Sequence, residues 1–218
     1  MNIEEYLDKR FPTVELVPTI YYQWDIGIHF SLGEGIYQLK ENGELNLERF
    51  HTGYKQALTI FKELYDQNDD LFLVTNIYRR KTQQQRKMKV YYPNLRDKNN
   101  LKRLQVKTYP YPFEEDRREE YEMQQFSLQC KVNDIRVNGL LKAAIHEDFS
   151  LKPRFGVDSV HYPDVFFVNI TKDIIFFLYD DRGCEVIART ADRLRPLYEK
   201  YYNWIEEVDR ERIEKSLL

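Results

Sequence analysis

The strongest constraint on the fold of this chain lies in its C-terminal third, where three apolar runs are separated by very short polar turns. The runs cover residues 165–170, 174–179 and 184–188, and the segments 171–173 and 180–183 join them. Strands connected by such short loops pair with their neighbours in the sequence. We therefore expect a three-stranded antiparallel meander in this region.

Helix and strand patterns alternate upstream of the meander. Between about 47 and 67, apolar side chains recur at the spacing of one helix face, and Asn46 precedes them as a candidate N-cap. The next segment, 71–78, is apolar on both faces, as a central strand is. Further strands are expected at 26–32, 36–39 and 123–132, and further helices at 2–11, at 134–148 and at about 194–205.

These patterns predict an α+β fold with a mixed, mostly antiparallel sheet and packed amphipathic helices. Hydrophobic residues make up 42% of the 218 positions and aromatic residues 15%, which is enough for a sizeable core. We expect a single domain over residues 1–218, in which 79–122 forms a charged, hairpin-like insertion.

Several stretches of the chain form a recognisable set of motifs. They are the run 164–170, the turn Tyr179-Asp180-Asp181-Arg182-Gly183, the ending Leu194-Arg195-Pro196-Leu197-Tyr198 and the upstream segments 24–28 and 71–76. Together they resemble a bacterial family, domain of unknown function 3885. The resemblance covers most of the chain and is most pronounced over residues 164–206. It implies the fold class, and it implies no activity, catalytic residue or cofactor.

A basic segment is the first candidate binding site. Residues 79–107 contain eleven Lys and Arg side chains against one acid, so this stretch has a net charge of +10 and the rest of the chain −13. Positive charge beside aromatic faces suits single-stranded nucleic acid or another polyanion. The candidate residues are Arg79, Arg80, Lys81, Arg86, Lys87, Lys89, Arg96, Lys98, Lys102, Arg103 and Lys107, with Tyr91 and Tyr92.

The acids that follow offer a structural explanation for the same charges. Six of them come close behind the basic segment: Glu114, Glu115, Asp116, Glu119, Glu120 and Glu122. A basic hairpin beside an acidic turn can neutralise itself within the fold, and surface pairs of this kind contribute only ~0–1 kcal/mol each. Both interpretations of the basic segment stay open.

The turn Asp180-Asp181-Arg182-Gly183 is the second candidate. Two adjacent carboxylates can bind Mg²⁺ or act as acid and base, and an arginine can hold phosphate. Successive residues of a strand point to opposite faces, however, so both carboxylates reach one ion only if the turn bends them together. Asp is favoured at the start of turns and Gly provides a left-handed position before the next strand, so we favour a structural role.

No other motif indicates catalysis, a metal site or a cofactor. The histidines, His29, His51, His146 and His161, lack the spacing of helical metal ligands. Cys130 and Cys184 lie in apolar contexts and are expected to be the buried thiols of a cytosolic protein. The N-terminus lacks the features of a secretory signal, and no apolar run is long enough to cross a bilayer.

These observations favour a cytosolic bacterial protein that binds a protein partner and catalyses no reaction. A toxin-neutralising, immunity-like role fits by analogy alone. The first alternative is nucleic-acid or polyanion binding through residues 79–107. The second is a metal-dependent hydrolase that uses Asp180 and Asp181.

Overall fold

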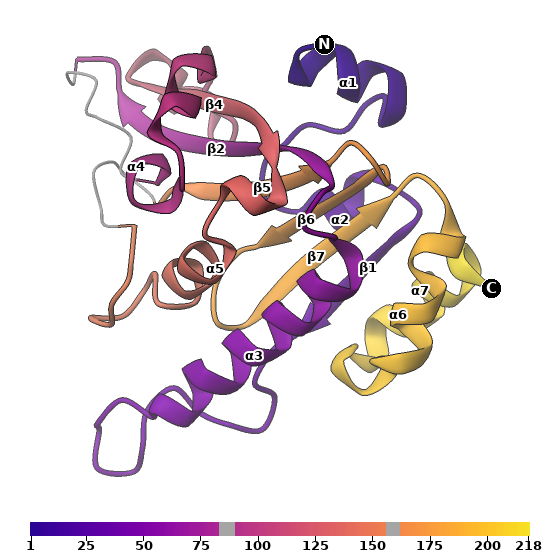
Figure 1. Cartoon of the computed structure of the whole chain (residues 1–218). Helices are drawn as coiled ribbons and strands as arrows, with labels where there is room; N and C mark the ends of the chain where they lie inside the picture. Colours follow the sequence, from indigo (N-terminus) through magenta and orange to yellow (C-terminus); the bar gives the residue numbers. More distant parts are fainter. Residues whose placement is uncertain (83–89, 156–161) are drawn as a thin grey trace.

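A seven-stranded sheet forms the centre of the protein (Figure 1). The computed structural model describes residues 1–82, 90–155 and 162–218. The strands lie in the order β1-β7-β6-β5-β2-β4-β3. Their bounds are β1 Gly27–Ser31, β2 Asp70–Arg80, β3 Gln105–Pro110, β4 Tyr121–Lys131, β5 Asp164–Asn169, β6 Ile174–Leu178 and β7 Gly183–Ala188.

The predicted α+β class is confirmed, and the C-terminal meander is formed by β5, β6 and β7 as expected. The description of the sheet as mixed is wrong, because every strand pair in the described part of the chain is antiparallel. The reason is that β2 and β4 pair along their whole length, from Asp70–Lys131 to Arg80–Tyr121, as the two strands of one long hairpin. The segment 81–120 connects these two strands.

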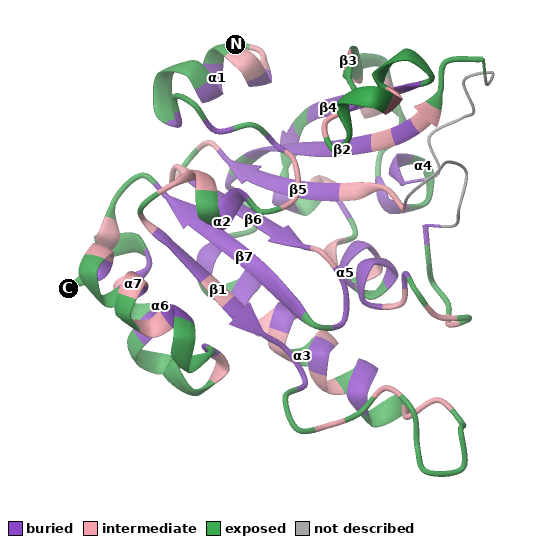
Figure 2. Ribbon diagram, turned by 180° about the vertical axis from the view of Figure 1, so that it is seen from behind, coloured by how far each residue is buried: buried purple, intermediate pink, exposed green. Residues whose placement is uncertain are grey.

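Helices and loops cover both faces of the sheet because its strands are apolar on both sides. On one face, Leu73 and Phe167 pack with helices α3 and α5. On the other face, Phe72 and Phe166 pack with α1 and the segment that follows it. Figure 2 shows the buried strands between these two layers. The helices are α1 Ile3–Arg10, α2 Ile20–Gln23, α3 Leu47–Leu64, α4 Tyr91–Asn94, α5 Val137–Ile145, α6 Arg195–Lys200 and α7 Glu207–Leu217.

Short 3-10 helices complete the connections between these elements. They are η1 Lys98–Arg103, η2 Glu115–Glu119, η3 Val132–Asp134, η4 Ala191–Arg193 and η5 Tyr202–Trp204. Helices α6 and α7 lie beside β1 at the edge of the sheet (Figure 1), where they protect an edge strand from pairing with another chain. Within the described residues, no helix combines the length and the apolar character that a membrane crossing requires.

Two local predictions fail where the chain leaves the sheet after β1. The expected strand at 36–39 is reduced to an isolated bridge between Leu39 and Leu45, because no further strand of the described segments lies alongside it. Asn46 does precede α3, but its side chain makes no capping hydrogen bond. Helices α2, α4 and α7 and strand β3 were not expected from the sequence.

Candidate functional site

The turn between β6 and β7 is built by two arginine–carboxylate interactions. Asp180 accepts hydrogen bonds from the backbone N–H of Arg182 at 2.7 Å and from its Nε at 2.8 Å. Asp181 accepts one from Nε of Arg49, also at 2.8 Å. Each carboxylate therefore has its own arginine, and the two point to different partners. This arrangement supports a structural turn rather than a shared metal ion at Asp180 and Asp181.

The Arg49–Asp181 pair is almost completely shielded from water. Arg49 is 6% exposed and Asp181 2%. The guanidinium group also donates from Nη2 to the backbone oxygen of Asp181 at 2.9 Å and from Nη1 to the backbone oxygen of Gly33. A charged pair can be buried at this depth because its hydrogen-bonding groups are matched. Arg49 therefore connects α3, the β6–β7 turn and the end of β1.

Gly183 occupies its place in the turn for a reason other than the predicted one. Its φ angle is not positive, so the expected left-handed position is wrong. A Cβ atom at this position would lie 2.0 Å from the hydroxyl oxygen of Tyr179 and 2.7 Å from the backbone oxygen of Phe30. Glycine is required because the ring of Tyr179 and strand β1 both pass against its backbone.

The Arg49 contacts fix the base of a projecting hairpin, residues 34–46, which we call the arm. The backbone N–H of Gly33 donates to Oε1 of Gln56 at 2.7 Å, which adds a second connection to α3. Within the arm Leu39 pairs with Leu45, and the predicted Asn42-Gly43 turn is present with Gly43 at a φ of +81°. Figures 1 and 2 show the arm extending from the start of α3 away from the sheet.

Large apolar side chains of the arm face solvent. Tyr37 is 81% exposed and Leu39 52%, and Leu47 at the base of the arm is 61% exposed. The sequence analysis missed these residues as a surface because it assigned 36–39 to a strand. It also missed Arg49. The sequence does contain a signal for Arg49. This charged residue and Gly53 both fall on the apolar face of the helix, which indicates a polar neighbour that approaches the helix closely.

The basic segment does not form one continuous surface in the described residues. Arg79 pairs with Glu122 across β2 and β4, Arg80 donates to the Tyr121 hydroxyl, and Lys107 pairs with Glu4 of α1. Lys98, Lys102 and Arg103 belong to η1 and are exposed together with Lys81, Arg96 and Tyr92. Arg86, Lys87 and Lys89 lie outside the described residues.

Tyr91 is fully buried, and its hydroxyl lies within hydrogen-bonding distance of the backbone oxygens of Leu73 and Phe126, at 2.9 and 3.0 Å. Its ring is therefore part of the core, whereas the ring of Tyr92 is 64% exposed. Some of the acids expected to neutralise the basic segment pair with it and others do not. Glu122 forms an ion pair with Arg79, whereas Glu114 and Glu115 form ion pairs with two arginines of η2, Arg117 and Arg118.

A histidine-centred network connects the last helix to the sheet. Nδ1 of His29 lies 3.0 Å from a carboxylate oxygen of Asp209, and Nε2 lies 2.8 Å from the Tyr179 hydroxyl. The three residues come from β1, α7 and the end of β6. The network therefore fastens α7 to the edge of the sheet, a contact that the sequence spacing of the histidines did not reveal.

Carboxyl groups with raised pKa values gather near the end of α5. Glu147 is 7% exposed, and its Oε1 accepts no hydrogen bond within the described structure. Burial, with the nearby charges of Asp164, Asp148 and Asp180, raises the pKa of Glu147 to about 10. Burial also raises the pKa of Asp164 to about 7. Glu147 is therefore a neutral acid at pH 7.

Neither acids nor thiols assemble a metal centre in the described ranges. No group of three or more His, Cys, Asp or Glu residues there could hold a metal ion. Cys130 and Cys184 are free and buried, as expected. Burial raises the pKa of the Cys130 thiol to about 12, so this sulfur is a poor nucleophile.

Comparison with known proteins supplies the family. A model described as Domain of unknown function (DUF3885) matches residues 3–209. The chain belongs to this family. YnaE of Bacillus subtilis (strain 168), described as an uncharacterized protein, is 63% identical to this DUF3885 protein over 209 residues, which cover 95% of this chain and 98% of YnaE. No solved structure matches the chain. The match confirms the family expected from the motifs.

Substituting Gly183 with alanine should destabilise this DUF3885 protein by about 1–3 kcal/mol, the usual cost of overpacking a tight contact. Either the Tyr179 ring or strand β1 must shift to make room for the added methyl group. Urea unfolding monitored by circular dichroism measures the change. An unfolding midpoint equal to that of the wild type would contradict the rigid contact at Gly183.

Substituting Arg49 with methionine should cost about 3–5 kcal/mol, because the Asp181 carboxylate then stays buried without its charged partner. The double variant Arg49→Met/Asp181→Asn removes both charges and should recover part of the loss. Urea unfolding of the two single variants and the double variant gives the coupling energy. Additive losses would show that the pair does not stabilise the fold as a unit.

Glu147 should make the protein less stable as the pH rises. In the folded state its pKa is about 10, whereas the pKa of a glutamate exposed to water is 4.5, so between these pH values unfolding releases a proton. Each pH unit in this window can then cost up to ~1.4 kcal/mol of unfolding free energy. The variant Glu147→Gln has no proton to lose, so its stability advantage over the wild type should grow from pH 5.5 to pH 8.

Unfolding by urea at several pH values tests the Glu147 prediction. Glu199→Gln, at an exposed position of α6, is the matched control and should show no growing advantage. If the difference between Glu147→Gln and the wild type is the same at every pH, the Glu147 carboxyl is not held protonated by the fold.

Proposed function

We propose that this DUF3885 protein is a protein-interaction module and that the arm, residues 34–46, is its recognition element. The observation that carries the proposal is the exposure of Tyr37 and Leu39 on a hairpin whose base is held by the buried Arg49–Asp181 pair. Large apolar side chains gathered on a projecting element are unfavourable in water and become favourable when a partner covers them.

The anchored base supports binding for an entropic reason. A flexible loop loses conformational freedom when it binds, and that loss weakens the complex. Here both ends of the arm are fixed, at Gly33 by Arg49 and Gln56 and at residue 47 by the start of α3. Two internal hydrogen bonds, from Lys40 N–H to the Glu44 oxygen and from Asn46 N–H to the Gln38 oxygen, keep the hairpin closed.

The composition of the arm indicates the chemistry of its partner. Glu34, Glu41 and Glu44 outnumber Lys40, so the arm is acidic around its apolar side chains. A complementary surface has an apolar pocket for a tyrosine or leucine side chain and basic residues around it. Tyrosine is among the side chains most often found at the energetic centre of interfaces. A basic toxin protein is one partner with this chemistry.

We also keep a cytosolic location as part of the proposal, supported by two free, buried thiols. The nucleic-acid alternative has less support. Basic residues of 79–107 are divided between β2, η1 and β3, and Arg79 and Lys107 are paired with acids. The hydrolase alternative has less support as well, since Asp180 and Asp181 each hold an arginine.

Affinity capture followed by a binding measurement tests the proposal. The full-length protein serves as bait in a Bacillus subtilis lysate, and the captured protein is then purified and titrated calorimetrically. We expect the variant Tyr37→Ser/Leu39→Ser to bind it at least tenfold more weakly, as the loss of a hot spot does. The control Val208→Ser changes an apolar side chain that is also 81% exposed, but on α7, and should bind like the wild type.

Two results would contradict the arm as recognition element. One is an arm variant that binds the captured protein as tightly as the wild type does. The other is an equal loss of affinity in the arm variant and in Val208→Ser. A titration with a mixed-sequence oligonucleotide at several salt concentrations tests the nucleic-acid alternative. Phosphate contacts release ~0.7–0.9 counterions each, so a binding constant that does not change with salt concentration would contradict this alternative.

A further inference from the structure

An apolar cavity opens on the side of the protein formed by the connection between β2 and β4. Its volume is about 870 Å³. Parts of α4, η1, α5 and the segment 153–155 line it. Pockets of a few hundred to about a thousand cubic ångströms with mostly apolar walls are typical of small-molecule sites. Neither the arm nor the β6–β7 turn contributes to this cavity.

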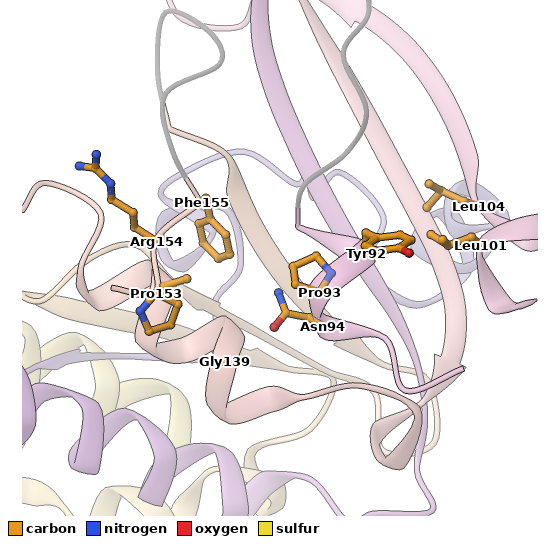
Figure 3. A pocket seen from close by; sticks show the side chains of 10 residues that line it. Tyr92, Pro93, Asn94, Leu101, Leu104, Gly139, Pro153, Arg154 and Phe155 are labelled. Atoms are coloured by element: carbon orange, nitrogen blue, oxygen red, sulfur yellow. The ribbon is translucent and has the colours of Figure 1, made fainter. Parts of the chain in front are cut away.

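The walls of the cavity are side chains held in place by the fold. Figure 3 shows Pro153 and Phe155 on one side, Tyr92 and Pro93 on the other, and Gly139 of α5 beneath them. Asn94 is 9% exposed, and its Nδ2 donates to the backbone oxygen of Val90 at 2.8 Å.

The floor of the cavity depends on a glycine. A Cβ atom at Gly139 would lie 2.6 Å from Oδ1 of Asn94, so a larger residue would displace this side chain. Because Gly139 leaves this space free, the Asn94 side chain already has its place in the floor, and a preformed site lowers the entropic cost of binding.

Exposed cations lie at the rim of this apolar cavity. Arg154 is one of the lining residues and is itself exposed. Nζ of Lys98 lies 4.8 Å from the centroid of the Tyr92 ring, and Arg154 turns outward from the rim in Figure 3. The acid beside them, Asp97, accepts a hydrogen bond from the backbone N–H of Asn99 at 2.9 Å.

We propose that this cavity binds a free medium-chain fatty acid or a similar amphipathic carboxylate. Its hydrocarbon chain would lie against Phe155, Leu101 and Leu104, which removes apolar surface from water on both partners. Its carboxylate would stay at the rim near Arg154 and Lys98. Charge complementarity thus selects an anion, and the apolar walls select an anion with a hydrocarbon body.

Calorimetric titration of the full-length protein with decanoate, below its micellar concentration, tests the proposal. We expect one molecule bound per chain. The neutral analogue 1-decanol should bind at least fivefold more weakly, because it lacks the charge that the rim attracts. Butyrate, which keeps the charge and lacks the chain, should give no measurable binding.

Two variants separate the contribution of the apolar wall from that of the charged rim. Ala143→Leu adds a larger side chain to the wall formed by α5 and should weaken decanoate binding at least tenfold. The rim variant Arg154→Gln changes an exposed residue only, so it should fold normally and lower the preference for decanoate over 1-decanol. Lys9→Gln on α1, which lies on the opposite face of the sheet, is the control and should bind decanoate like the wild type.

Several results would overturn the proposal. They are the absence of saturable binding at one molecule per chain, equal affinity for decanoate and 1-decanol in the wild type, and unchanged decanoate affinity in the rim variant. Sedimentation with phosphatidylglycerol vesicles without binding of monomeric decanoate would identify a lipid surface instead. If Ala143→Leu does not fold, the rim variant still decides the outcome.

Discussion

The buried ion pair between Arg49 and Asp181 determines how the parts of this protein are joined. A guanidinium group cannot be left without partners at 6% exposure, so its donors must be matched by acceptors from neighbouring elements. Those acceptors are supplied by the β6–β7 turn and by Gly33 at the end of β1. Helix α3, the meander and the start of the arm are consequently held in a single geometry by one side chain.

The same pair explains the residue types of the turn that marks the family. Asp181 serves the helix, while Asp180 accepts hydrogen bonds from Arg182 and so closes the turn itself. Gly183 then allows the Tyr179 ring to reach His29, whose other nitrogen contacts Asp209 of α7. A motif that resembles a metal or phosphate site in the sequence is, in the structure, a junction between the sheet, α3 and α7.

The sequence predicted the elements whose apolar pattern is local and left out those that depend on distant contacts. The meander and α3 have continuous apolar faces, so their type and approximate bounds could be predicted. Helix α7 has few apolar positions, and besides the buried Ile213 and Leu217 it is held by His29 and by contacts with β1, which no spacing reveals. Strand β3 is largely exposed and, among the strands that the structure describes, pairs with β4 alone, so its side chains show no buried face.

The candidate sites show the same difference between features that a local pattern reveals and features that depend on distant contacts. Charge counting located the basic segment, but it could not separate the cations that pair within the fold from those that remain at the surface. Arg79 and Lys107 are used to join β2 to β4 and β3 to α1, respectively. Lys98 lies with Arg154 at the rim of an apolar cavity instead of along a continuous groove. An isolated cluster of this kind is better matched to one carboxylate than to a chain of phosphates, since a polymer gains affinity by repeating its contacts along a track.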